Sequence, residues 1–508
     1  MSIEKNLWDA ANQLRANSGL KSSEYSYPVL GLVFLKYADY KFTISEKEFS
    51  SKMSKRNRKI GKEDYLAKSA IYLNNKARFK YLLELPEGEN IGQKVNDAML
   101  HIEKDNPDLK DVLPKIYTKF SNSLLVELLR IMDSIPKDIE GDIFGKIYEN
   151  FLGEFAMSEG RKGGEFFTPT SIVKLIVEIL KPFDGRIYDP ACGSGGMFVQ
   201  SARFVKEHKS NPVQNISIFG QEKEEETLKL NKMNLAVHEL AGDIKQGISY
   251  YEDLHSSINK FDYVMANPPF NVSGVDKEKL KDDERFIFGM PSADNANYLW
   301  IQIFYSALNK NGKAGFVMGN STIDIGGSER EIRKKIIKSN VIDIIISIGT
   351  NFFYTVTLPC TLWFFNKKKE KKNKILFINA ENIFHAIDRA HKEFLPEQIE
   401  FISNIVKLYN DEKLDNVNGS EKLILKSFPK KKYEDVPNLC AIANIEDIEK
   451  NNWSLNPGSY IKFIKEEQNL SFPTFLKESF YELNELNKKS KNLESEILKN
   501  LKQIIKDI

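Results

Sequence analysis

The stretch that decides the fold reads Asp189-Pro190-Ala191-Cys192-Gly193-Ser194-Gly195-Gly196-Met197. It follows a short apolar run that predicts a β-strand, and it opens a stretch that predicts a helix. Glycines at such a junction let the backbone turn tightly and approach a ligand closely. The N-terminus of the following helix adds unpaired N–H groups. The stretch therefore predicts a ligand site at the end of a strand in an α/β sheet.

Outward from this loop, residues 165–385 alternate short apolar runs with amphipathic stretches. The apolar runs predict strands at 186–188, 216–220, 263–265, 314–318 and 341–348, and the gaps predict helices at 171–181, 223–240, 296–309 and 329–338. Repetition of strand and helix predicts a mostly parallel, Rossmann-like α/β sheet. Two further runs, 361–365 and 375–378, flank a lysine-rich segment and predict a hairpin with a solvated basic turn.

The regions on either side of this α/β pattern have a different character. Residues 1–160 show helical spacing of apolar residues and end in a glycine-rich loop, and residues 475–508 have the spacing of amphipathic helices. We therefore predict a helical N-terminal domain (1–160), a Rossmann-like catalytic domain (161–400) and a C-terminal region (401–508). The tail helices of that last region fit internal packing as well as docking on a partner.

Composition restricts the class of protein. The 508 residues carry 73 Lys and Arg against 71 Asp and Glu, so no overall charge excess favours nucleic acid, and binding to DNA must use local patches or a partner. The three cysteines have neither disulfide-framework nor metal-ligand spacing, and no metal site is predicted. The N-terminus lacks the apolar core of a signal peptide, and no run is long enough for a membrane span. We expect a cytoplasmic protein.

An acidic residue, Glu222, ends the second predicted strand. In that position a carboxylate can accept hydrogen bonds from ribose hydroxyls, although Glu222 also fits the start of a charged helix. A nicotinamide dinucleotide is disfavoured, because Phe198 stands where the third glycine of G-x-G-x-x-G is required. S-adenosylmethionine has no pyrophosphate and does not need that glycine, so we predict it as the cofactor.

A second motif, Asn267-Pro268-Pro269-Phe270, follows the predicted strand that ends at Met265. Two consecutive prolines fix the backbone and stop the sheet, which holds the asparagine in a stiff loop at the carboxyl edge, where α/β sites lie. The alternative is a proline turn capped by asparagine. The strand, the aromatic residue and the upstream glycine loop, all in order, favour a catalytic turn.

The residue types in this turn suit methylation of the exocyclic N6 amine of adenine. That nitrogen is a poor nucleophile because its lone pair is delocalised into the ring. The Asn267 side-chain oxygen and the Pro268 carbonyl can accept its two protons, and this geometry frees the lone pair for attack on a methyl group. Phe270 would stack on the base, and a base in a duplex must flip out to reach such a pocket.

A third segment precedes the glycine loop and reads Gly164-Glu165-Phe166-Phe167-Thr168-Pro169-Thr170. With the other two motifs it resembles the amino-methyltransferases. The whole chain resembles the modification subunit of type I restriction–modification systems, an N6-adenine DNA methyltransferase family with the gamma order of motifs. The resemblance extends from Leu7-Trp8-Asp9 to Leu455-Asn456-Pro457, and so covers nearly the full length.

The resemblance implies roles for individual residues. Those that would bind the cofactor are Glu165, Phe166, Phe167, Thr168, Pro169, Thr170, Asp189, Gly193, Ser194, Gly195, Gly196, Glu222 and Asp253. Within this set Asp189 would anchor the glycine loop and Glu222 would bind the ribose. The catalytic residues would be Asn267, Pro268, Pro269 and Phe270, and Phe353 would pack against the flipped base. Asp253 and Phe353 also fit a loop acid and a core aromatic.

The resemblance also implies partners. These are double-stranded DNA, a specificity subunit that reads it and a motor–nuclease restriction subunit, with two copies of this chain per complex. The sequence has no G-x-x-x-x-G-K-[ST] motif for a motor, and its C-terminal region is short and polar for a target-recognition domain. The alternatives are methylation of a protein glutamine amide or of cytosine N4, which pose similar chemistry, and a non-catalytic scaffold.

Overall fold

The computed structural model describes residues 3–16, 19–20, 22–53, 60–66, 70–86, 88–135, 143–158, 167–208, 210–292, 294–353 and 357–464, with scattered residues of 476–498. These form two compact units, Met1–Lys462 and Phe463–Ile508. In the second unit the described residues are exposed, and those from Leu476 onward are helical. No helix in the described part of the chain is long and apolar enough to cross a membrane. The predicted domain boundaries at 160 and 400 stay predictions.

The N-terminal region is helical, as predicted. Its elements are α1 (Ile3–Ala16), α2 (Ser22–Met53), α3 (Lys62–Leu66), η1 (Asn75–Ala77), α4 (Phe79–Leu83), α5 (Ile91–Asp105), η2 (Pro107–Leu109), η3 (Tyr117–Lys119), α6 (Asn122–Asp133) and α7 (Ile143–Ser158). They share one hydrophobic core that also takes in Met233 and Val237 of α11 (Glu225–Val237). The helical region is therefore packed onto a helix of the α/β region.

A nine-stranded sheet forms the centre of the α/β region, in the order β11-β8-β6-β7-β5-β4-β1-β2-β3. The strands are β1 (Gly185–Asp189), β2 (Ile216–Glu222), β3 (Gly242–Gln246), β4 (Phe261–Ala266), β5 (Leu308–Gly319), β6 (Ile342–Ile348), β7 (Cys360–Asn366), β8 (Lys374–Asn379) and β11 (Cys440–Asn444). Only β7 and β11 run against the others. This is the mostly parallel α/β sheet that the sequence predicts.

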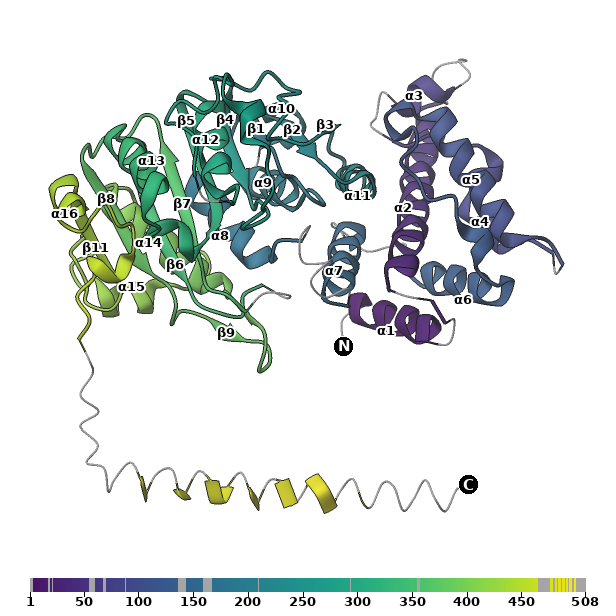
Figure 1. Ribbon diagram of the computed structural model, residues 1–508. Coiled ribbons are helices and arrows are strands. Elements are labelled where there is room, and N and C mark those ends of the chain that lie inside the picture. Colours follow the sequence, from purple (N-terminus) through teal and green to yellow (C-terminus); the bar gives the residue numbers. More distant parts are fainter. Residues whose placement is uncertain are drawn as a thin grey trace. The chain divides into compact units, whose positions relative to one another are not determined.

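Helices cover both faces of this sheet (Figure 1). The remaining elements are α8 (Thr170–Leu180), α9 (Gly196–Glu207), α10 (Pro212–Asn215), η5 (Lys277–Leu280), α12 (Asn297–Ala307), η6 (Asn320–Ile323), α13 (Gly327–Lys338), β9 (His385–Ala386), β10 (Lys392–Glu393), α14 (Pro396–Tyr409), α15 (Glu421–Ser427), α16 (Ile445–Lys450) and η7 (Pro457–Ser459). One hydrophobic cluster joins α8, α9 and α14 to the sheet, and a second joins α12 and α13 to it.

The predicted hairpin of residues 361–365 and 375–378 is wrong. Both runs are strands, β7 and β8, but β6 lies between them and pairs with each. Every residue of β6 is buried, so a strand that is apolar on both faces takes the inner position. The turn between them is also less solvated than predicted, because Lys369 is 6% exposed and its Nζ donates to the carbonyl of Ile342 at 2.5 Å. Burial lowers the pKa of Lys369 to about 8.

The topology places the carboxyl ends of the parallel strands β1, β2, β4, β5, β6 and β8 at one edge of the sheet. Neighbours β2 and β4 flank β1 on opposite sides, so the chain direction across the sheet reverses there. In open α/β sheets such a reversal point is where ligands bind, outside the carboxyl ends of the strands. The glycine loop follows β1 and the Asn267 turn follows β4, so both predicted motifs lie at this point.

Candidate functional site

Hydrogen bonds from three side chains brace the glycine loop. Asp189 is buried and its Oδ1 accepts from the amide of Ala191 at 2.9 Å, while burial raises its pKa well above the ordinary range. Gly193 and Gly195 have φ of +49° and +86°, a region that suits glycine. The loop's carbonyls are bound from α11, where Asn231 Nδ2 donates to Gly193 at 2.9 Å and Asn234 Nδ2 to Ser194 at 2.8 Å.

Glu222 lies beside this loop. Its Oε2 accepts from the amide of Gly193 at 3.0 Å and its Oε1 from the amide of Glu224 at 3.0 Å. Burial raises the pKa of Glu222 above its ordinary value, although these amide donors oppose the change. The carboxylate thus braces the turn at the end of β2.

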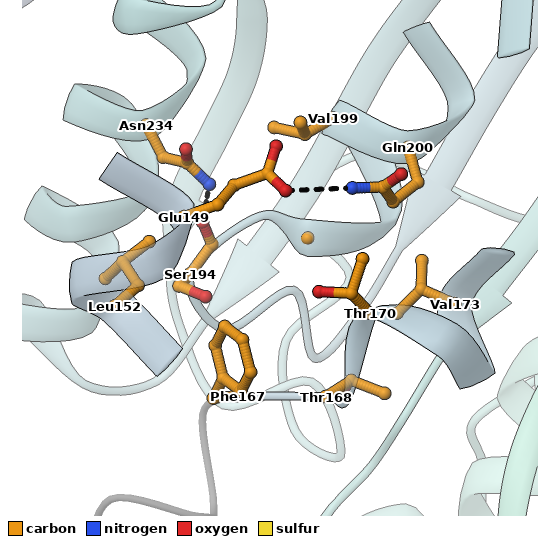
Figure 2. A pocket seen from close by; sticks show the side chains of 11 residues that line it. Glu149, Leu152, Phe167, Thr168, Thr170, Val173, Ser194, Val199, Gln200 and Asn234 are labelled. Carbon is orange, nitrogen blue, oxygen red and sulfur yellow. Dashed lines mark hydrogen bonds between the residues drawn. The ribbon is translucent and has the colours of Figure 1, made fainter. Parts of the chain in front are cut away.

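A small pocket opens between the N-termini of α8 and α9 (Figure 2). Its walls come from three parts of the chain, namely α7, the segment around α8 and the glycine loop with α9 and α11. The lining residues are Glu149, Leu152, Phe167, Thr168, Thr170, Val173, Ser194, Gly196, Val199, Gln200 and Asn234. A Cβ added to Gly196 would meet none of the described residues within 4 Å beyond its own helix and chain neighbours, so this glycine leaves space open among them.

The carboxylate of Glu149 ties the N-terminal helices to the wall of this pocket. It comes from α7, and its Oε1 accepts from Arg203 at 2.9 Å and contacts His238 Nε2 at 3.0 Å. Its Oε2 accepts from Gln200 Nε2 at 3.2 Å, which Figure 2 shows. Burial alone would raise the pKa of Glu149, but His238 and Arg203 hold that pKa below its ordinary value. The pocket therefore has a charged wall.

The Asn267 turn projects toward the same segment. Asn267 Nδ2 donates to Thr168 Oγ1 at 3.0 Å, so the two motifs meet although they are 99 residues apart. Its Oδ1 is buried and has no hydrogen-bond partner among the described residues. Pro268 is buried and Pro269 is exposed. The arrangement leaves one strong acceptor free in a stiff turn, and buried acceptors without partners are rare in proteins.

Two aromatic residues complete this end of the site. The rings of Phe270 and Phe353 lie 6.4 Å apart, edge to face, and both are partly buried. Phe353 belongs to the loop after β6, so the structure brings together residues that the sequence separates by more than eighty positions. Phe270 also lies beside Gly319 at the end of β5. The pair forms an apolar wall next to Asn267.

Other predicted site residues lie apart from the pocket or outside the description. Asp253 binds its own loop, since both of its oxygens accept from the amide of Ser257, at 2.9 and 2.8 Å. Its cofactor role stays a prediction. Pro169 precedes α8. Glu165 and Phe166 lie outside the described residues.

Sequence reasoning missed the contributions of Glu149, Gln200, Asn231 and Asn234. The signal for the two asparagines was their spacing with His238, which puts polar residues at intervals of three and four on one buried face of α11 and its C-terminal cap. No such local pattern marks Glu149 or Gln200.

Two family models match this chain. The one described as N-6 DNA Methylase covers residues 139–469, which include the pocket, the glycine loop and the Asn267 turn. The one described as HsdM N-terminal domain covers residues 3–132, within the helical region.

The chain is also similar to named proteins over most of its length. It is 36% identical to the type I restriction enzyme MjaIX methylase subunit of Methanocaldococcus jannaschii, over 97% of this chain and 90% of that one. It is 35% identical to the HindI methylase subunit of Haemophilus influenzae, over 82% and 94%. A type I methyltransferase subunit from Streptococcus thermophilus has the same fold, with a TM-score of 0.74, 22% identity and 91% and 99% coverage.

Proposed function

The chain belongs to the N-6 DNA methylase family, as a methylase subunit of the type I restriction enzymes and an adenine-specific DNA methyltransferase, and on this premise we propose how its residues act. In our proposal the Asn267 turn binds the amine of a flipped adenine, and the glycine loop with its pocket binds S-adenosylmethionine. The observation that carries the proposal is the Asn267 amide, whose Nδ2 is held by Thr168 while its Oδ1 has no partner among the described residues.

The residues of the turn would act by holding the target amine. Because Thr168 accepts from Asn267 Nδ2, the amide is oriented with its oxygen free to accept one N6 proton. The carbonyl of Pro268 would accept the other. Both acceptors would draw the nitrogen lone pair out of conjugation with the ring, and the amine would lose a proton to solvent once the N–C bond has formed and the bond from methyl to sulfur has broken. Phe270 and Phe353 would pack against the base.

The residues around the glycine loop fit S-adenosylmethionine, which when bound supplies a methyl group on a sulfonium sulfur. Glu222 would accept from the ribose hydroxyls, and Gly193 to Gly196 would line the cofactor with Thr168 and Thr170. Three observations support this fit: the open space at Gly196, the buried Asn234 Oδ1 that lacks a partner in the described part of the chain, and the charged wall at Glu149. The amino-acid part of S-adenosylmethionine carries charges of its own, and these suit a pocket wall that contains the Glu149 carboxylate.

The test is methyl transfer by the chain assembled with its specificity subunit. Labelled methyl groups should enter duplex DNA, and digestion should return them as N6-methyl-2′-deoxyadenosine. Deletion of the gene should remove N6-methyladenine from one sequence motif in the host genome. Label in N4-methylcytosine or in a protein glutamine would contradict the proposal, and absence of any transfer would favour the scaffold alternative.

Cofactor binding should depend on the protonation of Glu222. Because burial raises the pKa of this carboxyl, it takes up its proton at a higher pH than an ordinary glutamate. Affinity for S-adenosylhomocysteine should be full above that pKa and fall as the pH drops through it. In Glu222→Gln the affinity at neutral pH should be about tenfold lower, the loss of roughly one charge-assisted hydrogen bond, and the acid dependence should vanish. Calorimetry from pH 5 to pH 8 measures both, and an acid dependence that persists in the variant would contradict this role.

We further propose that the chain assembles with a specificity subunit and a motor–nuclease subunit, in two copies, and that it acts on double-stranded DNA. The relatives named above are subunits of type I restriction enzymes, which supports this assembly. Removal of everything after Lys462, where the first compact unit ends, should abolish co-purification with the specificity subunit. Binding of S-adenosylhomocysteine should be unchanged in the truncated chain. A complex that survives the truncation would place the docking surface elsewhere.

A further inference from the structure

A two-stranded hairpin, residues 385–393, projects from the sheet edge that carries the site (Figure 1, label β9). Its strands β9 and β10 pair Ala386 with Lys392 and His385 with Glu393. All residues from His385 to Ala390 are exposed, and the apolar Ile387 is 51% exposed. Neither strand continues into the nine-stranded sheet. The hairpin therefore adds nothing to the core, and its position needs another explanation.

The hairpin has a defined shape rather than a loose tip. Asp388 Oδ1 accepts from the amides of Ala390 and His391 at 2.7 and 2.8 Å, and its Oδ2 contacts His391 Nδ1 at 2.8 Å. The amide of Ile387 donates to the carbonyl of His391 at 3.0 Å. The one acidic group at the tip is therefore engaged within the turn, and Arg389 is left exposed beside it.

The base of the hairpin is joined to the loop that carries Phe353. The amide of Lys392 donates to the carbonyl of Asn351 at 2.8 Å. The rings of Phe352 and Phe394 lie 4.5 Å apart, and Lys392 Nζ lies 3.8 Å from the centre of the Phe384 ring. The position of the tip is thus fixed relative to the wall where the target base would pack.

The hairpin follows β8, whose end lies four strand positions from that of β4. Neighbouring strands are roughly 4.8 Å apart, so the end of β8 lies about 19 Å from the end of β4, where the Asn267 turn begins. This distance exceeds the ~12 Å width of the major groove of B-DNA. The glycine loop and Glu222 lie on the opposite side of β4, so the cofactor takes that half of the edge. A duplex that delivers a base to Asn267 would therefore extend over the half that carries the hairpin.

We propose that the 385–393 hairpin contacts the DNA backbone beside the flipped adenine, with Arg389 bound to a phosphate. The proposal rests on the proposed function, since it takes the position of the target base from Asn267. A rigid tip presents its guanidinium with little ordering cost, and arginine matches phosphate geometry with two parallel hydrogen bonds. Ile387 would lie against the neighbouring sugar. The contact would position the duplex without reading its sequence.

The test compares two charge reversals of equal size, each in the assembled complex. Arg389→Glu changes the hairpin tip. Lys372→Glu is the control: it changes an exposed lysine in the turn between β7 and β8, at the opposite edge of the sheet, where Asn366 at the end of β7 pairs with Lys313. Binding to fluorescent duplexes with and without the target site is measured by anisotropy at several salt concentrations. Arg389→Glu should weaken both duplexes about equally and lower the salt slope by about 1, while Lys372→Glu should change neither.

Three further readouts decide the interpretation. Affinity for S-adenosylhomocysteine and co-purification of the specificity subunit should be unchanged in Arg389→Glu, and methylation at saturating DNA should approach the wild-type rate. Unaltered DNA binding, or an equal loss in both variants, would overturn the proposal. Loss of the specificity subunit would overturn it in favour of a protein contact. Failure of the proposed function is distinguishable, because the wild-type complex would then bind DNA and transfer no methyl group.

Discussion

Replacement of Asn267 by alanine should lower kcat by about 10²- to 10³-fold, the size expected when one preorganised polar group is removed from a reacting centre. The variant removes the side-chain oxygen that the turn would offer to the target amine and also the donor that meets Thr168. Asn267→Asp keeps an acceptor and should lose less activity. The rate is measured as single-turnover methyl transfer to a duplex that contains the target site.

Binding separates this effect from damage to the fold. S-adenosylhomocysteine should bind Asn267→Ala within about twofold of the wild type, and the specificity subunit should still co-purify. Because the turn lies after β4 and the glycine loop after β1, a catalytic loss without a binding loss assigns the role to Asn267 itself. Persistence of wild-type turnover in Asn267→Ala would mean that another group holds the amine.

Gly196→Ala should have opposite effects on stability and on cofactor binding. Its Cβ would meet no neighbouring atom of the described residues within 4 Å, and alanine favours a helix over glycine by up to about 1 kcal/mol, so the melting temperature should stay the same or rise. The methyl group would occupy space in the pocket that we assign to the cofactor. Overpacking of about 1–3 kcal/mol predicts affinity for S-adenosylhomocysteine about 10- to 100-fold weaker.

A matched variant controls for changes in the helix. Ala202→Gly, in the middle of the same helix and buried, should destabilise the fold while leaving cofactor affinity nearly unchanged. Calorimetric titration and thermal unfolding of both variants give the two quantities. If Gly196→Ala bound S-adenosylhomocysteine as tightly as the wild type, the pocket beside Gly196 would not be part of the cofactor site.

The fold was predictable where a motif of functional residues comes directly after a strand. The glycine loop after β1, the acidic end of β2 and the proline turn after β4 each carry their own local signature, and the parallel topology then brings them to one edge. The order of the strands in the sheet was harder to predict from the sequence. Residues 242–246 form the edge strand β3 with a polar sequence, and β6 separates two strands that are neighbours in the chain.

The pocket was predictable only in part, because some of its walls come from distant helices. Glu149 lies on α7 and reaches the pocket only through the packing of the N-terminal helices on α11. No regular spacing of residues in the sequence indicates the contact between Glu149 and the pocket. The amide orientation of Asn267 is similar, since its partner Thr168 is 99 residues away and the two meet only once the sheet has formed.

A structure of the complete complex with duplex DNA and a non-reactive cofactor analogue is the most direct test of the catalytic turn. Its decisive measurement is the distance from N6 of the target adenine to Asn267 Oδ1 and to the Pro268 carbonyl. We expect both distances within about 2.7–3.2 Å, the range of hydrogen bonds. An adenine amine bound by other residues, with Asn267 Oδ1 turned away from it, would contradict the account.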